Sequence, residues 1–289
     1  MNYIRFDNPT TFYDQVKSFL VAQEAQHNLI LGITRGIQLG DYSDYHPYMA
    51  CVEDNGQVIA VIVRTPPHNV LLSQIENPEA ILPAIVEDLR DVYPSLQGVI
   101  ASKLVSRLFA EMWEAATGQP FRLATKERIY KLELVIFPRG VAGEFRWAEE
   151  TDFELLVNWH IKFVEDAGIG ITDISRSQKL IHRFLEADPQ ERRLGIWMVA
   201  GQPVSMAGYM GSTPNGMRVG AVYTPRDQRK KGYAGACVAT LSQSILDMGK
   251  KFCFLFTDLA NPTSNHIYQE IGYKPVADVD EYRFEESPL

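Results

Sequence analysis

One loop concentrates positive charge in a chain that is otherwise acidic, the loop in VYTPRDQRKKGYAGACVATL at residues 222–241. Its four cations fall within six positions: Arg226, Arg229, Lys230 and Lys231. Gly232 and the small Ala234 follow, and apolar residues then recur at helical spacing. A helix N-terminus presents unpaired N–H groups and partial positive charge, so it binds anions where small residues let them reach the backbone. This pattern favours a phosphate or pyrophosphate site over the alternative, a solvated basic turn.

Other phosphate-binding and catalytic motifs are missing from the sequence. The P-loop pattern GxxxxGK[ST] does not occur, and GYAG lacks the first glycine of the dinucleotide fingerprint GxGxxG. No GxSxG serine elbow is present, and the six histidines show no metal-binding spacing such as HxxxH. We therefore expect neither a bound metal nor hydrolase chemistry.

A second group of chemically active side chains lies in TDLANPTSNHIYQEIGYKPV, at residues 257–276. Asn261 suits the start of a helix, Pro262 its first position and Gly272 its end. Tyr268 lies beside the apolar face of this helix, where its hydroxyl can point into a cleft. A phenol with a pKa of about 10 stays protonated at pH 7 and can donate a proton. Packing is the alternative role for this tyrosine.

Both stretches resemble motifs of the GNAT superfamily of acyl-CoA N-acyltransferases. Residues 229–234, RKKGYA, are similar to its R/Q-x-x-G-x-G/A motif, and residues 261–273 are similar to its N-x-x-x-N-x-x-Y-x-x-x-G-F/Y signature. The resemblance extends over residues 144–286. It implies an N-acetyltransferase that uses acetyl-CoA as cosubstrate and passes the acetyl group directly to a primary amine.

The resemblance also implies roles for individual residues. The amides of residues 230–234 would hold the coenzyme A pyrophosphate, the backbone of Val222 and Thr224 would pair with the pantetheine arm, and Tyr268 would give a proton to the departing thiolate. The residues implied for coenzyme binding are Val222, Tyr223, Thr224, Arg229, Lys230, Lys231, Gly232, Tyr233, Ala234, Asn261 and Asn265.

The sequence departs from the family pattern at the general base. Many relatives carry a glutamate on the central strand, but RVGAVYT, at residues 218–224, has no carboxylate. Water, a backbone carbonyl or a residue elsewhere must then accept the amine proton. Glu165, Asp166 and Asp173 lie in the segment that borders the acceptor site in relatives. They either attract a cationic amine or form a solvated helix end.

The chain divides into two similar halves around IFPRGVAGEF, at residues 136–145. Each half contains two strands that turn at a Gly-Gln pair, and each ends in an aromatic, charged strand, at residues 127–133 and 280–286. The second half has the predicted order α-α-β-β-β-α-β-α-β. We therefore predict an α/β protein with mixed sheets, built from two GNAT-like units in tandem, with domains at residues 1–137 and 143–289.

The first half lacks the phosphate loop of the second. The matching stretch, VRTPPHNVLLSQIENPEAI at residues 63–81, has no glycine and carries Glu76 and Glu79 where the second half has cations. We interpret the first half as a degenerate GNAT-like unit that can wall the acceptor pocket. An unrelated α/β substrate domain is the alternative.

Composition bounds the remaining possibilities. The 289 residues are 46% hydrophobic and 22% charged, which is sufficient for a buried core. No apolar run approaches the roughly 18 residues of a membrane span, and the N-terminus has no signal-peptide pattern. Cys51, Cys237 and Cys253 have no CxxC spacing, so they are interpreted as buried thiols. We therefore expect a cytoplasmic protein that uses no membrane.

The expected partner is a small-molecule or peptide amine, and a homodimer is left open. A net charge of −8 disfavours nucleic acid as a partner, although RDQRKK alone would suit one. A second alternative is a non-catalytic acyl-CoA-binding sensor or interaction protein, which would keep the loop without needing Tyr268.

Overall fold

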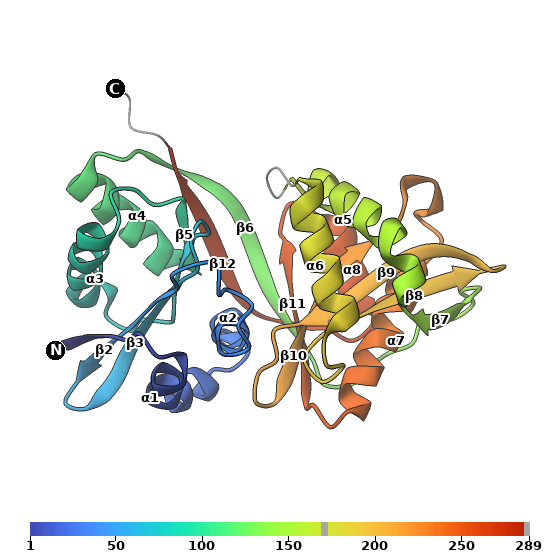
Figure 1. The fold of residues 1–289 in the computed structure, drawn as a ribbon, viewed down its shortest axis with the longest axis horizontal. Coiled ribbons are helices and arrows are strands. Elements are labelled where there is room, and N and C mark those ends of the chain that lie inside the picture. The colour runs from blue at the N-terminus through green and yellow to red at the C-terminus, as the bar shows by residue number, and fades with distance from the viewer. Residues whose placement is uncertain (169–172, 286–289) are drawn as a thin grey trace. The chain divides into compact units, whose positions relative to one another are not determined.

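The computed structural model describes residues 1–168 and 173–285, and it divides into two compact units. Unit 1 is built from Met1–Tyr130, Phe256–Asn261 and the segment from Pro275 onward, and unit 2 from Lys131–Leu255 and Pro262–Lys274. Each unit contains a sheet with helices packed on it, which confirms the predicted α/β class (Figure 1).

Unit 1 contains a mixed sheet in the strand order β1-β2-β3-β4-β5-β12-β6. Its elements are β1 (Asn2–Arg5), α1 (Pro9–Ala22), α2 (Asn28–Gln38), β2 (Tyr48–Asp54), β3 (Gln57–Arg64), β4 (Val70–Leu72), α3 (Pro78–Val92), β5 (Gly98–Ser102), α4 (Lys103–Thr117), β6 (Phe121–Leu132) and β12 (Lys274–Phe284). The β4–β5 pair is parallel, whereas β1–β2, β2–β3, β3–β4 and β5–β12 are antiparallel.

Both faces of the unit 1 sheet are buried. Because side chains alternate along a strand, Ala50 and Val52 face the cluster that α3 and α4 complete, whereas Met49 and Cys51 face the cluster that α1 and α2 complete. Strand β2 therefore contributes side chains to two hydrophobic cores, one on each face of the sheet. Helices on both faces are the arrangement expected of an α/β unit.

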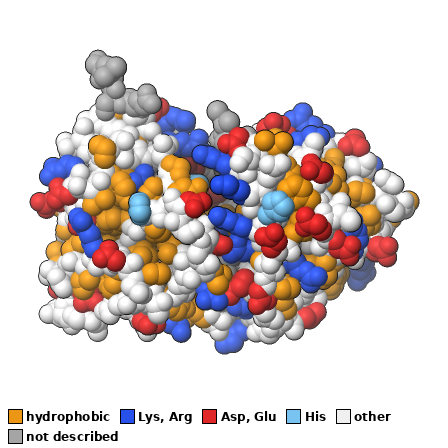
Figure 2. Space-filling model, viewed as in Figure 1, with side chains coloured by type: hydrophobic (Ala, Val, Ile, Leu, Met, Phe, Trp, Pro, Cys, Tyr) orange, Lys and Arg blue, Asp and Glu red, His pale blue; other side chains and the backbone are white. Residues whose placement is uncertain are grey.

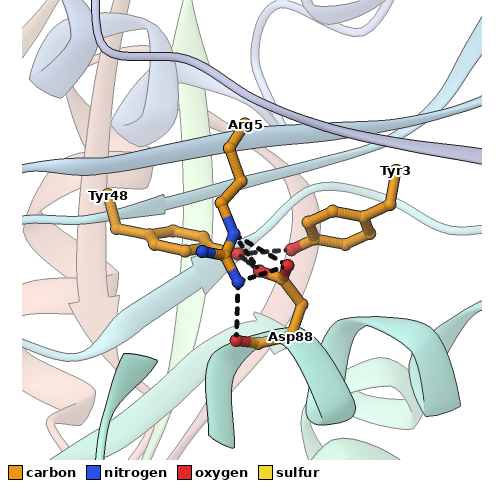
Figure 3. Close-up of polar contacts among 4 residues, drawn as sticks. All are labelled: Tyr3, Arg5, Tyr48 and Asp88. Atoms are coloured by element: carbon orange, nitrogen blue, oxygen red, sulfur yellow. Dashed lines mark hydrogen bonds and ion pairs between the residues drawn. The ribbon is translucent and has the colours of Figure 1, made fainter. Parts of the chain in front are cut away.

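Four polar side chains join the edge of this sheet to α3 (Figure 3). Arg5 Nε donates hydrogen bonds to both carboxylate oxygens of Asp88 at 2.8 Å. The Tyr48 hydroxyl also donates to Asp88, and the Tyr3 hydroxyl lies 2.6 Å from the Tyr48 hydroxyl. Burial raises the pKa of both tyrosines, so both hydroxyls keep their protons and remain donors. The network fixes α3 against β1 and β2.

The last strand of the chain, β12, completes the sheet of unit 1. It pairs antiparallel with β5, from Val279 opposite Ser102 to Arg283 opposite Gly98. Tyr282 and Phe284 are buried in the core that contains α3 and α4. The second half therefore ends in the predicted aromatic strand, but the apolar face of this strand is buried in unit 1.

Ion pairs at the start of β12 add to this packing. Asp278 accepts from Lys103 at 2.8 Å and from Arg128 at 2.6 Å. The Arg128 and Lys103 cations lower the pKa of Asp278 to about 2. Each compact unit therefore combines segments that are distant in sequence. The domain boundaries at residues 1–137 and 143–289 stay a prediction.

Unit 2 contains the sheet order β11-β10-β9-β8-β7. Its elements are β7 (Glu144–Trp147), α5 (Phe153–Ala167), α6 (Ile174–Glu186), β8 (Arg193–Val199), β9 (Gln202–Met210), β10 (Gly216–Tyr223), α7 (Tyr233–Asp247), β11 (Phe252–Asp258), whose first four residues lie in this unit, and α8 (Pro262–Glu270). From α5 to β12 the element order is the predicted α-α-β-β-β-α-β-α-β. The β10–β11 pair is parallel and the other three pairs are antiparallel.

Helices cover both faces of the unit 2 sheet. In the view of Figure 1, α5 and α6 lie in front of the sheet, and α7 and α8 lie behind it. Residues of α5 and α6 pack against Leu194, Ile196 and Tyr223, and Gly235 of α7 faces Ile267 of α8. No helix among residues 1–168 and 173–285 is long and apolar enough to cross a membrane.

Candidate functional site

Strand β10 of unit 2 carries a bulge near its C-terminal end. In the antiparallel pairing with β9, Gly220 lies opposite Gly208, and the register then shifts so that Tyr223 lies opposite Met206. Ala221, inside this irregularity, has a φ of 49°, a left-handed conformation that non-glycine residues rarely adopt. A bulge bends its strand and redirects the backbone groups around it. Val222, a predicted coenzyme-binding residue, lies within this redirected segment.

On its other edge, β10 pairs with β11 only near its start. The parallel register joins Gly216, Met217 and Arg218 of β10 to Phe252, Cys253 and Phe254 of β11, and for the described residues it ends there. The part of β10 that contains Val222 continues beyond this pairing. A strand edge without a partner can pair with an extended ligand as if the ligand were an added strand.

The predicted phosphate loop leads directly from this strand into α7. After a short 3₁₀ turn at Arg226–Gln228, Lys230 and Gly232 both have positive φ angles, of 64° and 83°. Gly232 is the residue before α7, and no side chain caps that helix. The first backbone N–H groups of α7 have no acceptor within the helix, so they can bind an anion.

Gly232 has no room for a larger residue. A Cβ atom built there would lie 2.9 Å from Cγ2 of Val141, and its φ favours glycine in addition. The absence of a side chain is therefore a structural requirement, and it leaves the loop backbone accessible. This geometry fits the pyrophosphate of a coenzyme, which the sequence predicts at this point.

The arginines of the loop are held in place by Asp166, at the end of α5. One oxygen of Asp166 accepts from Arg226 at 2.6 Å, and the other accepts from Arg229. These two guanidinium groups lower the pKa of Asp166, which therefore stays ionised. Arg229 Nε also donates to the Thr224 carbonyl at 2.9 Å. The two arginines and the end of β10 thus form one connected unit with α5.

The sequence left two roles open for Glu165, Asp166 and Asp173, attraction of a cationic amine or a structural role at a helix end. The contacts of Asp166 and Asp173 favour the structural role for these two residues. Asp166 binds two arginines, and Asp173 accepts from the Arg176 N–H at 2.7 Å as the cap of α6. Both carboxylates therefore serve the protein's own structure. Glu165 remains exposed, and part of the predicted loop, residues 169–172, lies outside the described residues.

Tyr268 lies on α8 and is half buried. Its ring contacts Tyr273 edge to face at a centroid distance of 6.0 Å. Its hydroxyl makes no hydrogen bond to any residue that the structure describes. Burial raises the pKa of Tyr268 to about 12, so the group stays protonated well above pH 7. A protonated hydroxyl without a partner is suited to donate to a ligand.

The two asparagines of the second motif lie at and near the start of α8. Asn261 immediately precedes the helix, and its N–H donates to the Asp258 carbonyl at 3.0 Å. Asn265 lies on α8 one turn before Tyr268. Their roles toward a coenzyme stay predictions, as do those of Tyr223, Lys230, Lys231, Tyr233 and Ala234.

The structure identifies one contact of the basic loop that the sequence did not predict. Val141, about 90 positions earlier, lies against Gly232, and no motif marks it. His160 on α5 is half buried, and its Nδ1 lies 2.9 Å from the Ser177 hydroxyl. Burial lowers the pKa of His160, so its imidazole is neutral at pH 7. Trp159, the preceding residue of α5, packs on Tyr223 of β10 with the two ring centroids 6.0 Å apart.

The corresponding loop of unit 1 is built differently. It lies between β4 and α3 and contains the buried Ile75 and the exposed Glu76, and the exposed Glu79 follows in the first turn of α3. The Gln74 N–H, which could otherwise reach a ligand, donates to His27 Nε2 at 3.0 Å. A nearby pocket of about 30 Å³, lined in part by His27 and Gln74, has room for water but not for a coenzyme arm.

Three further observations concern the charged side chains, the cysteines and possible metal ligands. In Figure 2, Lys, Arg, Asp and Glu side chains are spread over the face shown, and several Lys and Arg side chains lie next to one another. Cys51, Cys237 and Cys253 are buried and unpaired with one another, as predicted. Across the described ranges, no cluster of His, Cys, Asp or Glu side chains has the arrangement of a metal site.

Comparisons with known proteins match this architecture. Residues 193–283 match the family described as FR47-like protein. A Drosophila protein aligns over 99% of both chains with a TM-score of 0.72 and 10% identity. A GCN5-related N-acetyltransferase from Sphaerobacter thermophilus aligns over 99% of this chain and 96% of its own, with a TM-score of 0.60 and 15% identity. No curated protein matches the sequence.

A tandem protein also shares the architecture over its whole length. This tandem GNAT protein from the clavulanic acid biosynthesis pathway aligns over 100% of the present chain and 99% of its own. The TM-score is 0.57 and the identity 11%. At such identities the likeness establishes a common fold, and it confirms the predicted tandem arrangement.

Proposed function

We propose that this chain, which has the fold of the GNAT acetyltransferases, is an N-acetyltransferase that moves an acetyl group from acetyl-CoA to the primary amine of a small molecule or peptide. One observation carries the proposal. Within the described ranges, the bulged strand β10 has no partner along one edge near its end, and it leads through the basic loop into α7. No described side chain caps α7, and Gly232, the residue before the helix, has no room for a side chain. This combination supports a site for a pantetheine arm next to a pyrophosphate.

The residues of unit 2 would divide the work of binding. The amides of residues 230–234 would hold the pyrophosphate, with Arg229 already oriented by Asp166 and by the Thr224 carbonyl. The free edge of β10 at Val222 would pair with the pantetheine amides. Such preorganised groups lose little freedom on binding, which favours affinity.

Acetyl-CoA supplies the thioester whose carbonyl carbon the amine nitrogen attacks. As the C–N bond forms, the Val222 N–H would donate to the carbonyl oxygen, which carries the developing negative charge. When the C–S bond breaks, Tyr268 would donate its proton to the sulfur. Its raised pKa of about 12 keeps that proton in place until a thiolate forms nearby.

The amine must also lose a proton, and β10 offers no carboxylate for this step. We propose that water, a backbone carbonyl or a residue from elsewhere in the chain accepts this proton.

The first test is calorimetric titration of acetyl-CoA into the wild-type protein and into Gly232→Glu. A side chain at this position collides with Val141, and its negative charge repels the pyrophosphate, so binding should be lost. Gly249→Glu is the matched control, since Gly249 also has a positive φ, of 90°, but lies beyond the opposite end of α7 with free space around it. Circular dichroism would verify that all three proteins are folded.

The outcomes separate two functions and include one that contradicts the proposal. Binding that is lost only in Gly232→Glu, followed by acetylation of members of an amine panel, supports the transferase. The same binding with no turnover of any amine favours a non-catalytic acyl-CoA sensor. A wild-type protein that binds neither acetyl-CoA, longer acyl-CoAs nor free coenzyme A contradicts the proposal.

A further inference from the structure

The segment that joins the two halves exposes an unusual row of apolar side chains. We define the crossing segment as residues 134–143, LVIFPRGVAG. Leu134, Ile136 and Phe137 are 75%, 56% and 52% exposed. Arg139, two residues later, is an exposed cation with no interaction with any described residue. Contiguous exposed apolar groups in a folded protein commonly mark a binding site.

The start of the crossing segment is fixed to the end of α8. The Ile136 N–H donates to the Ile271 carbonyl at 3.0 Å. A Cβ atom at Gly272 would collide with the Leu134 carbonyl, so the two backbones lie in direct contact there. This end of the segment is therefore held rigidly against unit 2, of which it is a part.

The other end of the crossing segment is fixed beside the coenzyme loop. The Trp197 indole N–H donates to the Ala142 carbonyl at 2.9 Å. A Cβ atom at Gly143 would collide with the Met198 carbonyl, and Val141 lies against Gly232 at the start of α7. The residues between the two attachments, 137–140, therefore lead from the end of α8 to the N-terminus of α7.

The distance along the chain limits how far these residues can lie from the loop. An extended chain spans at most about 3.6 Å per residue, so the Arg139 backbone lies within about 7 Å of the Val141 backbone, and the Phe137 backbone within about 14 Å. Both side chains are thus close to the proposed pyrophosphate seat. In coenzyme A, the adenosine 3′-phosphate is attached directly to that pyrophosphate.

We infer that the crossing segment binds the adenosine 3′-phosphate end of the acyl donor, an inference that rests on the proposed function. Phe137 offers an aromatic face on which adenine can stack, and such stacking is available to any base. Arg139 offers a planar guanidinium that can bind the 3′-phosphate with two hydrogen bonds. The exposed apolar row and the unpaired cation then have one common ligand.

The test compares coenzyme A with 3′-dephospho-coenzyme A by calorimetry. Arg139→Gln should weaken binding of coenzyme A about tenfold and leave that of the dephosphorylated form unchanged, because only the former carries the 3′-phosphate. Phe137→Ala should weaken both ligands about tenfold, because both contain adenine. The matched controls are Leu134→Ala, which removes an even more exposed apolar group at the α8 end, and Lys162→Gln, which removes a cation from α5.

The outcomes distinguish this inference from the proposed function. A wild-type protein that binds neither ligand contradicts both. A wild-type protein that binds coenzyme A, with Arg139→Gln and Phe137→Ala binding as tightly as the controls, overturns the inference and leaves the proposed function intact. Equal losses of both ligands in Arg139→Gln would also overturn it, since the arginine would then not recognise the 3′-phosphate.

Discussion

At the scale of single residues, the Tyr268 hydroxyl differs from those of three other tyrosines. Tyr3, Tyr48 and Tyr209 all have hydroxyl groups engaged in hydrogen bonds, to each other, to Asp88 or to the Pro189 carbonyl. Tyr268 is half buried with a hydroxyl that no described residue engages. A hydroxyl without a protein partner is open to a ligand, which fits the proposed role of Tyr268 as a proton donor.

Tyr268→Phe tests this use directly. The change removes the proton donor and keeps the ring, so kcat should fall about a hundredfold while the affinity for acetyl-CoA stays unchanged. Tyr45→Phe, at an exposed tyrosine of unit 1, should have no effect. A kcat unchanged by Tyr268→Phe would assign the residue to packing.

The pH profile gives a second readout of the same residue. Because burial raises the pKa of Tyr268 to about 12, the acid form persists where an ordinary tyrosine would begin to ionise. The wild-type kcat should therefore not decline between about pH 8 and pH 10. A fall in that range would show that the proton donor has an ordinary pKa.

At the scale of elements, the basic loop at residues 226–232 is held by α5 as well as by the strand before it. Asp166 at the end of α5 lies 60 positions before Arg226 and 63 before Arg229, and binds both. The four loop cations of the sequence are thus two arginines that share one carboxylate and two lysines, of which Lys231 donates to Gln228. The carboxylate restrains Arg229 beside Thr224 and reduces the repulsion among the cations.

The Asp166→Asn variant should reveal this contact through the pH dependence of its melting temperature. Because Arg226 and Arg229 lower the pKa of Asp166, its stabilisation is fully present above the ordinary value of 3.8 and is lost as the pH falls through the lower folded-state value. The variant should melt about 1–2 °C below wild type at pH 7, a small shift because the pair is exposed to solvent. The difference should shrink as the pH falls below 3.8. A constant difference across the whole range would assign the effect to packing rather than charge.

At the scale of the whole molecule, the two units are not two consecutive pieces of chain. β12 follows every element of unit 2, yet it lies between β5 and β6 in unit 1. Its aromatic residues Tyr282 and Phe284 belong to the unit 1 core, and Asp278 pairs with Lys103 and Arg128. Unit 1 can therefore not be complete until the C-terminus has been synthesised.

A chain that ends at Lys274 tests this dependence. It lacks the strand that pairs with β5 and exposes the core around Phe109 and Trp113, so unit 1 should fail to fold. Limited proteolysis should then cut within residues 1–130 and leave unit 2 fragments. A chain that ends at Glu285 keeps all of β12 and should resist protease as the full chain does. Equal resistance of both truncated chains would contradict the role of β12.

The sequence by itself determined the features that neighbouring residues decide. Gly232 precedes α7, Pro262 begins α8, and Gly272 follows its end, because capping and positive φ depend on a few adjacent residues. The periodicity of the second half likewise determined the order of its helices and strands, and the two motifs determined the predicted coenzyme site.

Only the tertiary structure decided what depends on contacts between distant positions. The partner of β12 could not be read from its pattern, because an aromatic, charged strand suits either sheet equally until its register with β5 is formed. Asp166 and Val141 carry no motif, and they contact the basic loop only because α5 and the crossing segment pack beside it. Local pattern fixed which loop can hold an anion, and packing over long sequence separations determined which residues surround it.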